Sequence, residues 1–206
     1  NSSPDHLRRY DDLEHYAASR FSLFRNQQGR DATVLNGDDP GIVNRLVGRD
    51  LPGRLFFFGT EAPGQRGAAI SGKEITVSGL GGSEAEKYSL AGSELAMEPN
   101  VHNSAAAIIA ARLLDCPPAA IRRAIAGFKP LAHRLAMVAE IGGVLYLDDS
   151  KATNIDATRR ALESLDKKTV LLAGGIDKGG EYSSVRELMK GKVKAMVLIG
   201  EGSVKL

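Results

Sequence analysis

Residues 147–154 read LDDSKATN, and this stretch places two carboxylates, two hydroxyls, a lysine and an amide at the end of an apolar run. A second polar stretch, GGIDKGG at 174–180, follows the apolar residues VLLA and adds Asp177 and Lys178. Two lysines among several carboxylates suit a ligand that carries phosphates or carboxylates, because ammonium groups form charge-assisted hydrogen bonds with anions. The second stretch lacks the G-x-x-x-x-G-K-[ST] spacing of a phosphate-binding P-loop.

The part of the chain after Pro130 must position these groups. It alternates strand, helix, strand, helix and strand, which indicates a parallel sheet with crossover helices. Its near-continuous apolar runs are typical of strands that are buried on both faces. We therefore expect three strands to lie side by side in one sheet, with a helix over 154–165 on one face: 144–148, 169–174 and 195–200. The stretches 134–141 and 144–150 are also expected to pair around Gly142 and Gly143.

Open parallel sheets bind their ligands beyond the carboxyl ends of the strands. Asp149 and Lys151 would lie just past one strand end and Lys178 past another, so these groups would share one rim. Arg134, at the domain junction, is expected to reach the same rim. The alternative is that each strand ends in solvent with ordinary turn residues, and the spacing alone favours neither interpretation.

The first 130 residues have a more mixed pattern of helices and strands. Helical spacing and short buried runs alternate at first, and Gly-rich turns then separate strand-like pieces between Ala68 and Ala96 that are consistent with a small antiparallel addition. We place a domain boundary near residue 131, which divides the chain into 1–131 and 132–206. The elements expected before it are helices at 11–24, 41–47, 102–115 and 119–128 and strands at 32–36 and 54–59.

The composition excludes several classes of protein. The 27 basic and 25 acidic residues leave a net charge of only +2, so neither nucleic acid nor a membrane is expected as a partner. Cys116 is the one cysteine of the chain, which excludes an intrachain disulfide and favours a reducing compartment, the cytoplasm. No apolar run approaches the ~20 residues that cross a bilayer. Both chain ends read as cut points, so a longer protein is expected.

Long motifs in the sequence resemble the UDP-N-acetylmuramoyl-L-alanine:D-glutamate ligases of the Mur ligase family. The C-terminal part carries HRLAMV, GVLYLDDSKATNIDATRRAL and VLLAGGIDKGG, and the Ser-Lys-Ala-Thr-Asn run is absent from the sister ligases and the folylpolyglutamate synthetases. The start is similar to the segment around the family's Asp-His-x-Asp-Arg motif. VLNGDDP and HNSAAAIIAA match further landmarks of the family's central domain, so the resemblance covers nearly the whole chain.

The resemblance implies an α/β fold in which a fragment of the central, ATP-binding domain, with a mixed sheet and helices, precedes a fragment of a Rossmann-like C-terminal domain with a mostly parallel sheet. It implies that ATP phosphorylates the carboxylate of UDP-N-acetylmuramoyl-L-alanine, that the amine of D-glutamate attacks the acyl phosphate, and that Mg²⁺ assists, in peptidoglycan precursor synthesis. We expect a cytoplasmic monomer. This fragment alone is expected to be inactive, because it lacks the ATP-cradling loop.

The resemblance also assigns roles to individual residues. His6, beside Asp5, would bind Mg²⁺, although a histidine near a helix start is more often structural. Asn103 would contact the nucleotide, although it could instead cap a helix. Thr153 would bind substrate, although it could also be a helix cap near Asn154. The remaining assignments are Arg134 at the ATP phosphates, Asp149 at the ribose, His133 among the catalytic residues, and Lys151 and Lys178 at the D-glutamate and the reacting groups.

Four positions depart from the family pattern. Arg20 stands where the family has a lysine that becomes carbamylated and binds a second Mg²⁺, and an arginine stays protonated. Arg8, Ala106 and Ala136 replace an aspartate, an asparagine and a glutamate of the family motifs. Three hypotheses therefore remain: a D-glutamate-adding ligase, another Mur-type amino-acid ligase, and a catalytically lapsed relative that binds a nucleotide or a partner.

Overall fold

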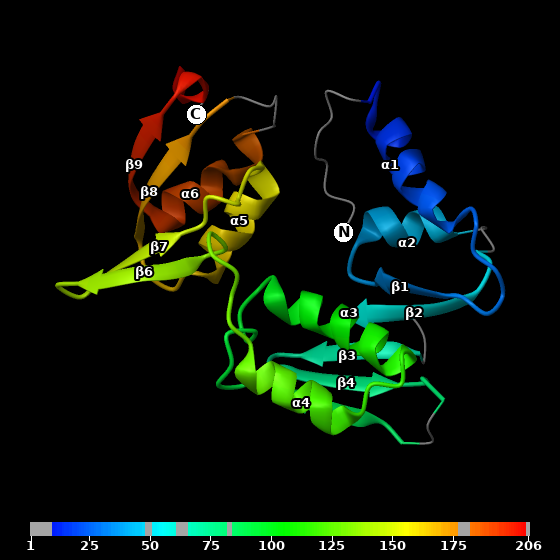
Figure 1. The fold of residues 1–206 in the computed structure, drawn as a ribbon. Helices are drawn as coiled ribbons and strands as arrows, with labels where there is room; N and C mark the ends of the chain where they lie inside the picture. The colour runs from blue at the N-terminus through cyan, green and yellow to red at the C-terminus, as the bar shows by residue number, and fades with distance from the viewer. Residues whose placement is uncertain (1–9, 48–50, 61–65, 82–83, 177–181, 205–206) are drawn as a thin grey trace. The chain divides into compact units, whose positions relative to one another are not determined.

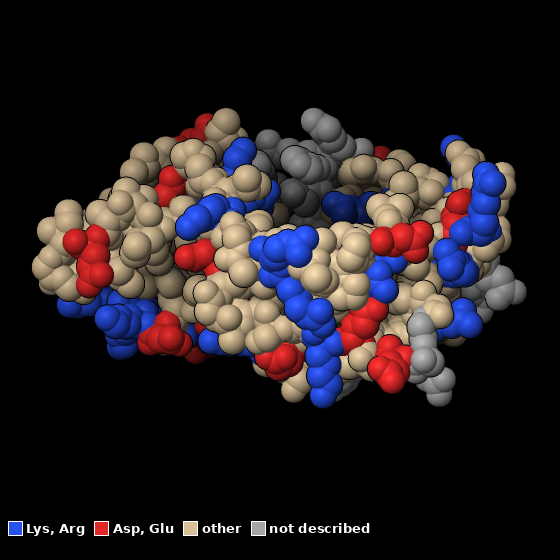
Figure 2. Space-filling view, turned by 60° about the horizontal axis from the view of Figure 1, so that its bottom comes forward, with Lys and Arg blue, Asp and Glu red and all other residues tan. Residues whose placement is uncertain are grey.

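The computed structural model of this chain describes residues 10–47, 51–60, 66–81, 84–176 and 182–204. The chain divides into two compact units, Asn1–Lys129 and Pro130–Leu206 (Figure 1). Lys and Arg side chains are interspersed with Asp and Glu on the face that Figure 2 shows, as the small net charge leads us to expect. Among the described residues, no helix combines the length and the apolar character that crossing a membrane requires.

The first unit contains a five-stranded sheet in the order β1-β2-β3-β4-β5. The first three strands run parallel, and the next two turn back as an antiparallel meander. The expected antiparallel addition after Ala68 is therefore confirmed. The strands are β1 (Ala32–Asn36), β2 (Arg54–Gly59), β3 (Gly67–Ser71), β4 (Glu74–Ser78) and β5 (Glu86–Ser89).

Helices cover this sheet where the sequence predicted them. The Ala-rich α3 packs across β1, β2 and β3, and α4 packs against β5 and α3. Their apolar faces, with Ile108, Ile109 and Ile121, join the strand side chains in one buried core. Aspartates cap the two shorter helices: Asp12 accepts from the His15 amide, and Asp39 from that of Gly41. The helices are α1 (Leu13–Phe21), α2 (Pro40–Leu46), α3 (Asn100–Leu113) and α4 (Pro118–Gly127), and the 3-10 turn η2 (Ser22–Phe24) follows α1.

A network of charged and polar side chains joins β5 to α3. The Arg112 guanidinium donates three hydrogen bonds of 2.8–3.0 Å to the Glu86 carboxylate and a fourth, at 2.8 Å, to the Cys116 carbonyl. Tyr88 is fully buried and donates from its hydroxyl to Glu86 Oε2. Burial and this carboxylate raise the pKa of Tyr88 to about 12, so the phenol keeps its proton. Every strong polar group in the cluster therefore has a partner.

The second unit contains two small sheets. β6 and β7 form an antiparallel hairpin, whose turn at Gly142 and Gly143 has φ values of 59° and 77°, the positive values that a tight hairpin turn requires. β8 and β9 form a parallel pair. The elements are β6 (Ala136–Ile141), β7 (Val144–Asp148), α5 (Ile155–Ser164), β8 (Thr169–Gly174), η3 (Tyr182–Val185), α6 (Arg186–Lys192), β9 (Val193–Ile199) and η4 (Glu201–Val204).

The expectation of three strands side by side in one sheet was wrong for β7. Within the described residues it pairs with β6 alone, whereas β8 and β9 pair with each other as predicted. The apolar run of β7 does not lie buried on both faces: Val144, Leu145 and Tyr146 are 46–55% exposed. An apolar run cannot by itself distinguish a central strand from a hairpin strand, and here the two-glycine turn decides the pairing. The rim argument that placed Asp149 at the end of a parallel strand therefore fails.

The Glu86–Arg112 pair gives a testable stability prediction. The Arg112 hydrogen bonds hold the pKa of Glu86 below its ordinary value. We expect Arg112→Met in the full-length protein to lower the free energy of unfolding at pH 7 by about 1–2 kcal/mol, because it leaves half-buried acceptors without donors. A carboxyl with a lowered pKa stabilises the fold above its unfolded pKa of about 4.3 and loses that contribution as pH falls, so the difference should shrink in acid. The exposed Arg123→Met is the matched control in urea unfolding, and an equal loss in both variants would contradict the account.

Candidate active site

The segment between β7 and α5 holds most of the polar groups that the sequence singled out. It turns tightly: the Ser150 amide donates to Asp148 Oδ1 at 2.9 Å, and the Ala152 amide to the Asp149 carbonyl at 2.7 Å. Asn154 ends the segment as the N-cap of α5 and accepts from the Ala157 amide. The Lys151 side chain is exposed at this turn. The polar groups of residues 148–154 are thus fixed by local hydrogen bonds, with the lysine free to meet a ligand.

A second segment, residues 133–135, is held against this turn. His133 Nδ1 lies 2.6 Å from Asp148 Oδ2, and the Leu135 amide donates to Asp149 Oδ1 at 3.0 Å. The Lys151 amide donates to the His133 carbonyl at 3.1 Å. His133 and Leu135 have φ values of 67° and 48°, a left-handed conformation that costs energy in residues other than glycine. The three hydrogen bonds compensate for that cost, and they place Arg134 between the residues they join.

The two aspartates of the turn have opposite electrostatic environments. Hydrogen bonds from the Ser150 amide and then from His133 lower the pKa of Asp148. Burial raises the pKa of Asp149, against the opposing effects of the Leu135 amide and the Arg134 charge. Because perturbed pKa values cluster at functional sites, the raised pKa makes Asp149 a candidate site residue.

Unit 2 thus brings together four of the predicted site residues, His133, Arg134, Asp149 and Lys151. Thr153 lies in the same segment, but the helix cap is Asn154. Asn103 is exposed on α3 in the first unit, and the N-cap of that helix is Pro99, so the capping alternative for Asn103 was also wrong. His6 and Lys178 lie outside the described residues.

Arg20 bears on whether a metal fits this chain. Its guanidinium lies 4.7 Å above the centre of the Tyr16 ring, so the two residues share a face of α1. Within the described ranges, no cluster of three His, Cys, Asp or Glu side chains is arranged to hold a metal ion. Asp5 and His6 fall outside those ranges. The described residues therefore supply no Mg²⁺ site from which a catalytic step can be derived.

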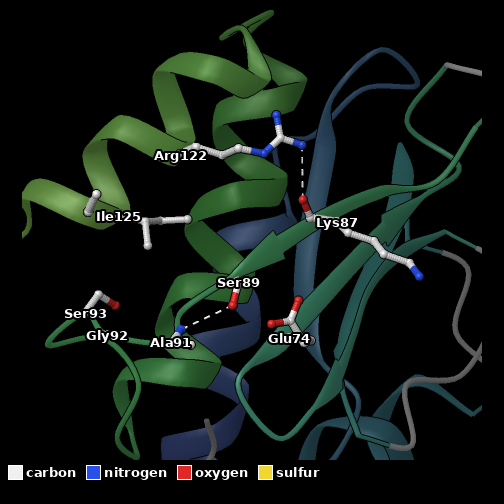
Figure 3. A pocket seen from close by; sticks show the side chains of 9 residues that line it. Glu74, Lys87, Ser89, Ala91, Gly92, Ser93, Arg122 and Ile125 are labelled. Carbon is white, nitrogen blue, oxygen red and sulfur yellow. Dashed lines mark hydrogen bonds between the residues drawn. The ribbon is translucent and has the colours of Figure 1, made fainter.

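A cavity of about 410 Å³ in the first unit contains none of the predicted site residues (Figure 3). It lies between the ends of β4 and β5, the loop after β5, and α4. The Arg122 guanidinium donates to the Lys87 carbonyl, and the Lys87 ammonium points away from Gly92 and Ile125 in the view shown. Neither cation is therefore directed into the cavity, and we assign it no ligand.

The sequence did not predict two sets of side-chain contacts in the described residues. The His133–Asp148 pair joins residues 15 positions apart, and no periodicity relates them. His102 contacts Asp38 and Glu98. The spacing of four residues between Glu98 and His102 could have indicated the second contact, whereas no pattern indicates the first. The motif VLNGDDP pointed to Asp38 as part of a landmark but not to its partner.

A comparison with protein-family models identifies the family of this chain. Residues 1–111 match the model of the Mur ligase middle domain, which is more than half of the chain. The chain belongs to the Mur ligase family. The match covers β1 to β5 and nearly all of α3, and so includes Asn103.

Two curated relatives of this Mur ligase chain carry the same name. It is 35% identical over 206 residues to the UDP-N-acetylmuramoylalanine--D-glutamate ligase of Syntrophus aciditrophicus and 38% identical over 208 residues to that of Acidobacterium capsulatum. Each match covers 100% of this chain, but 45% and 44% of the relative. The chain thus spans less than half the length of these relatives, and the resemblance read from its motifs is confirmed.

Solved Mur ligases share the fold. MurF of Acinetobacter baumannii aligns with 98% of this chain at a TM-score of 0.69 and 16% identity, over 46% of its own length. MurF of Thermotoga maritima, solved in complex with ADP, aligns with 95% of this chain at a TM-score of 0.62 and 17% identity, over 50% of its own length. At such identities the likeness establishes the α/β fold expected from the sequence.

Asp148 and Asp149 give a prediction with opposite signs for two neighbouring substitutions. Asp149→Asn should unfold at the same or a higher temperature than the wild type at pH 7, because a carboxyl with a raised pKa costs stability once it is ionised, and the amide oxygen still accepts from Leu135. Asp148→Asn should unfold at a lower temperature, because a carboxyl with a lowered pKa stabilises the fold when ionised.

The Asp149 difference should diminish as the pH falls toward about 4, because the folded carboxyl with its raised pKa is protonated first. The Asp148 difference should persist to about pH 4 and diminish only below it, where the unfolded chain takes up its proton before the folded one does. Calorimetric melting temperatures of the full-length protein between about pH 2 and 8 measure both. Two substitutions that shift the melting temperature in the same direction at pH 7 would contradict the opposite environments.

Proposed function

We propose that the full-length protein is an ATP-dependent ligase that adds D-glutamate to UDP-N-acetylmuramoyl-L-alanine in peptidoglycan precursor synthesis. The observation that carries the proposal is the Asp-Ser-Lys-Ala-Thr-Asn segment, held with Lys151 exposed beside Arg134 and Asp149. The names of the curated relatives support it. We further propose that residues 1–131 are part of the central domain and 132–206 part of the C-terminal domain, and that the protein acts in the cytoplasm as a monomer.

The proposed reaction forms an amide through an acyl phosphate. ATP transfers its terminal phosphoryl group to the carboxylate of the alanyl residue, the D-glutamate amine attacks the acyl carbon, and inorganic phosphate leaves with the oxygen that it received. Negative charge gathers on the phosphoryl group and then on the tetrahedral intermediate. Catalysis of this kind consists mainly of fixed cations and of the exclusion of water.

The residues of the turn fit these needs. The planar guanidinium of Arg134 offers paired donors that match a phosphate. The ammonium of Lys151 stands on a turn whose backbone is fixed by the His133 carbonyl, so it can hold a substrate carboxylate in one place. Asp149 keeps an acceptor oxygen for a ribose hydroxyl after accepting from the Leu135 amide. Lys178, Thr153 and Asn103 complete the proposed set, with His6 as the proposed Mg²⁺ ligand.

Mg²⁺ would neutralise phosphate charge in such a reaction. A cationic side chain at position 20 disfavours a second divalent ion nearby: at ~4 Å and an effective dielectric constant of about 20, each pair of unit charges repels by roughly 4 kcal/mol. Arg20 is therefore the observation that favours the second candidate function, a catalytically lapsed relative that still binds a nucleotide. A Mur-type ligase for another amino acid is a third possibility, and the intact Ser-Lys-Ala-Thr-Asn run disfavours it.

Substitution of Lys151 tests the proposed function directly. We expect Lys151→Ala in the full-length protein to lower kcat/KM for D-glutamate by at least about 100-fold, the usual effect of removing one preorganised charged donor. The assay follows ADP release with ATP, UDP-N-acetylmuramoyl-L-alanine and D-glutamate. The matched control is Lys168→Ala, an exposed lysine that precedes β8 in the same unit. If the Lys151 variant kept the wild-type kcat/KM, the proposed role of the turn would be wrong.

Arg20 supplies a prediction that separates an active ligase from a lapsed one. If the arginine weakens the metal site, Arg20→Lys should raise the rate of D-glutamate-dependent ATP hydrolysis, and added bicarbonate should raise it further by carbamylating the lysine. The assay compares both proteins over a range of Mg²⁺ concentrations. A wild type as active as the variant at every concentration would show that Arg20 does not impede the chemistry.

A further inference from the structure

His102 lies between two carboxylates that come from different parts of the first unit. Its Nε2 is 3.0 Å from Asp38 Oδ2, and its Nδ1 is 2.8 Å from Glu98 Oε2. The imidazole is 19% exposed and the Asp38 side chain 20%, and the ring meets Phe58 of β2 edge-on, with centroids 6.4 Å apart. Both ring nitrogens are therefore engaged in a largely enclosed setting.

The geometry favours the protonated form of this ring. A carboxylate only accepts hydrogen bonds, so both ring nitrogens must donate for both contacts to be satisfied. Only the imidazolium carries hydrogens on both nitrogens. The hydrogen bond to Glu98, and then that to Asp38, raise the pKa of His102 against the effect of burial. The cation stands in the first turn of α3, where the helix dipole disfavours positive charge, so the two carboxylates are what makes it stable there.

Asp38 connects His102 to the carboxyl ends of two parallel strands. It follows β1 by two residues, and its Oδ2 also accepts from the Thr60 amide at 2.7 Å and the Thr60 hydroxyl at 3.1 Å, directly after β2. Gly59, at φ 150°, makes room for this: a Cβ there would lie 2.4 Å from Asp38 Oδ1. The sheet rim is thus shaped to receive the carboxylate that holds the histidine.

Asn103 is the next residue of α3, and its side chain is exposed. The helix has no side-chain cap, because its N-cap is Pro99. The His102–Asp38 and Asp38–Thr60 hydrogen bonds therefore link the start of α3 to the ends of β1 and β2. Ligands of parallel sheets bind along this edge, so a shift of the helix start would move the Asn103 amide relative to them.

We propose that His102 is a positioning residue that fixes the amino end of α3, and with it the nucleotide contact of Asn103, to the carboxyl ends of β1 and β2. The inference rests on the proposed function, because it takes Asn103 as a nucleotide contact. We expect loss of the His102 contacts to weaken nucleotide binding and to leave D-glutamate binding unchanged. We also expect nucleotide affinity to fall as the pH rises through the pKa of His102, because the ring then loses a proton that it donates to a carboxylate. Asp38 and Glu98 are the charged side chains that face the ring among the described residues.

The test uses the full-length protein and the variant His102→Gln, which can satisfy one carboxylate only. We expect the Kd for ADP and the KM for ATP to rise about tenfold, a factor that corresponds to 1.4 kcal/mol, while the KM for D-glutamate stays within about twofold. The wild-type Kd for ADP should increase above neutral pH, and the variant should show no such dependence. Asp38→Asn and Gly59→Ala should weaken ADP binding in the same way, and they keep the test available if His102→Gln does not fold.

His15→Gln is the matched control, because His15 pairs with Asp11 at the same spacing of four residues but is exposed on α1. It should leave every constant unchanged. A wild type that binds no ADP would contradict the proposed function, and this inference with it. A wild type that binds ADP, with a His102→Gln variant that binds it equally well or loses ATP and D-glutamate binding alike, would overturn this inference alone.

Discussion

Three hydrogen bonds hold residues 133–135 against the turn at 148–151, and the candidate site depends on them. They join His133 to Asp148, the Leu135 amide to Asp149, and the Lys151 amide to the His133 carbonyl. Without them, two residues in a left-handed conformation would have no compensation, and nothing else in the described contacts would set Arg134 beside Asp149. The hairpin of β6 and β7 supplies the frame, because it starts directly after Leu135 and ends at Asp148.

Carboxylates determine the electrostatics of the candidate sites in both units. Asp148 is stabilised in its charged form, whereas burial disfavours the charge of its neighbour Asp149. In the first unit, Asp38 and Glu98 make a cation stable in the first turn of α3. The raised pKa of Asp149 lowers the stability of the fold once that carboxyl is ionised, and proteins retain such groups where charge must be held ready for a ligand.

The sequence was sufficient to predict most of the elements and their order. β1 and β2 match the predicted residues, and α3 lies within two residues of its predicted bounds, because strong periodicity and Pro117 with Pro118 mark them. The sheet membership of β7 was wrong, because pairing depends on the turn and not on apolar content. For the site, the motif located Asp149 and Lys151, whereas the His133–Asp148 and His102–Asp38 contacts join residues far apart in the sequence, which only folding brings together.

We propose that the full-length protein selects D-glutamate. The most direct measurement is mass spectrometry of the product after incubation with ATP, UDP-N-acetylmuramoyl-L-alanine and an equimolar mixture of D-glutamate, L-glutamate, L-lysine and D-alanine. The account predicts one product, larger than the nucleotide substrate by a D-glutamyl residue, with one ADP formed for each amide. A product that contains another amino acid, or ADP binding without any amide product, would contradict it.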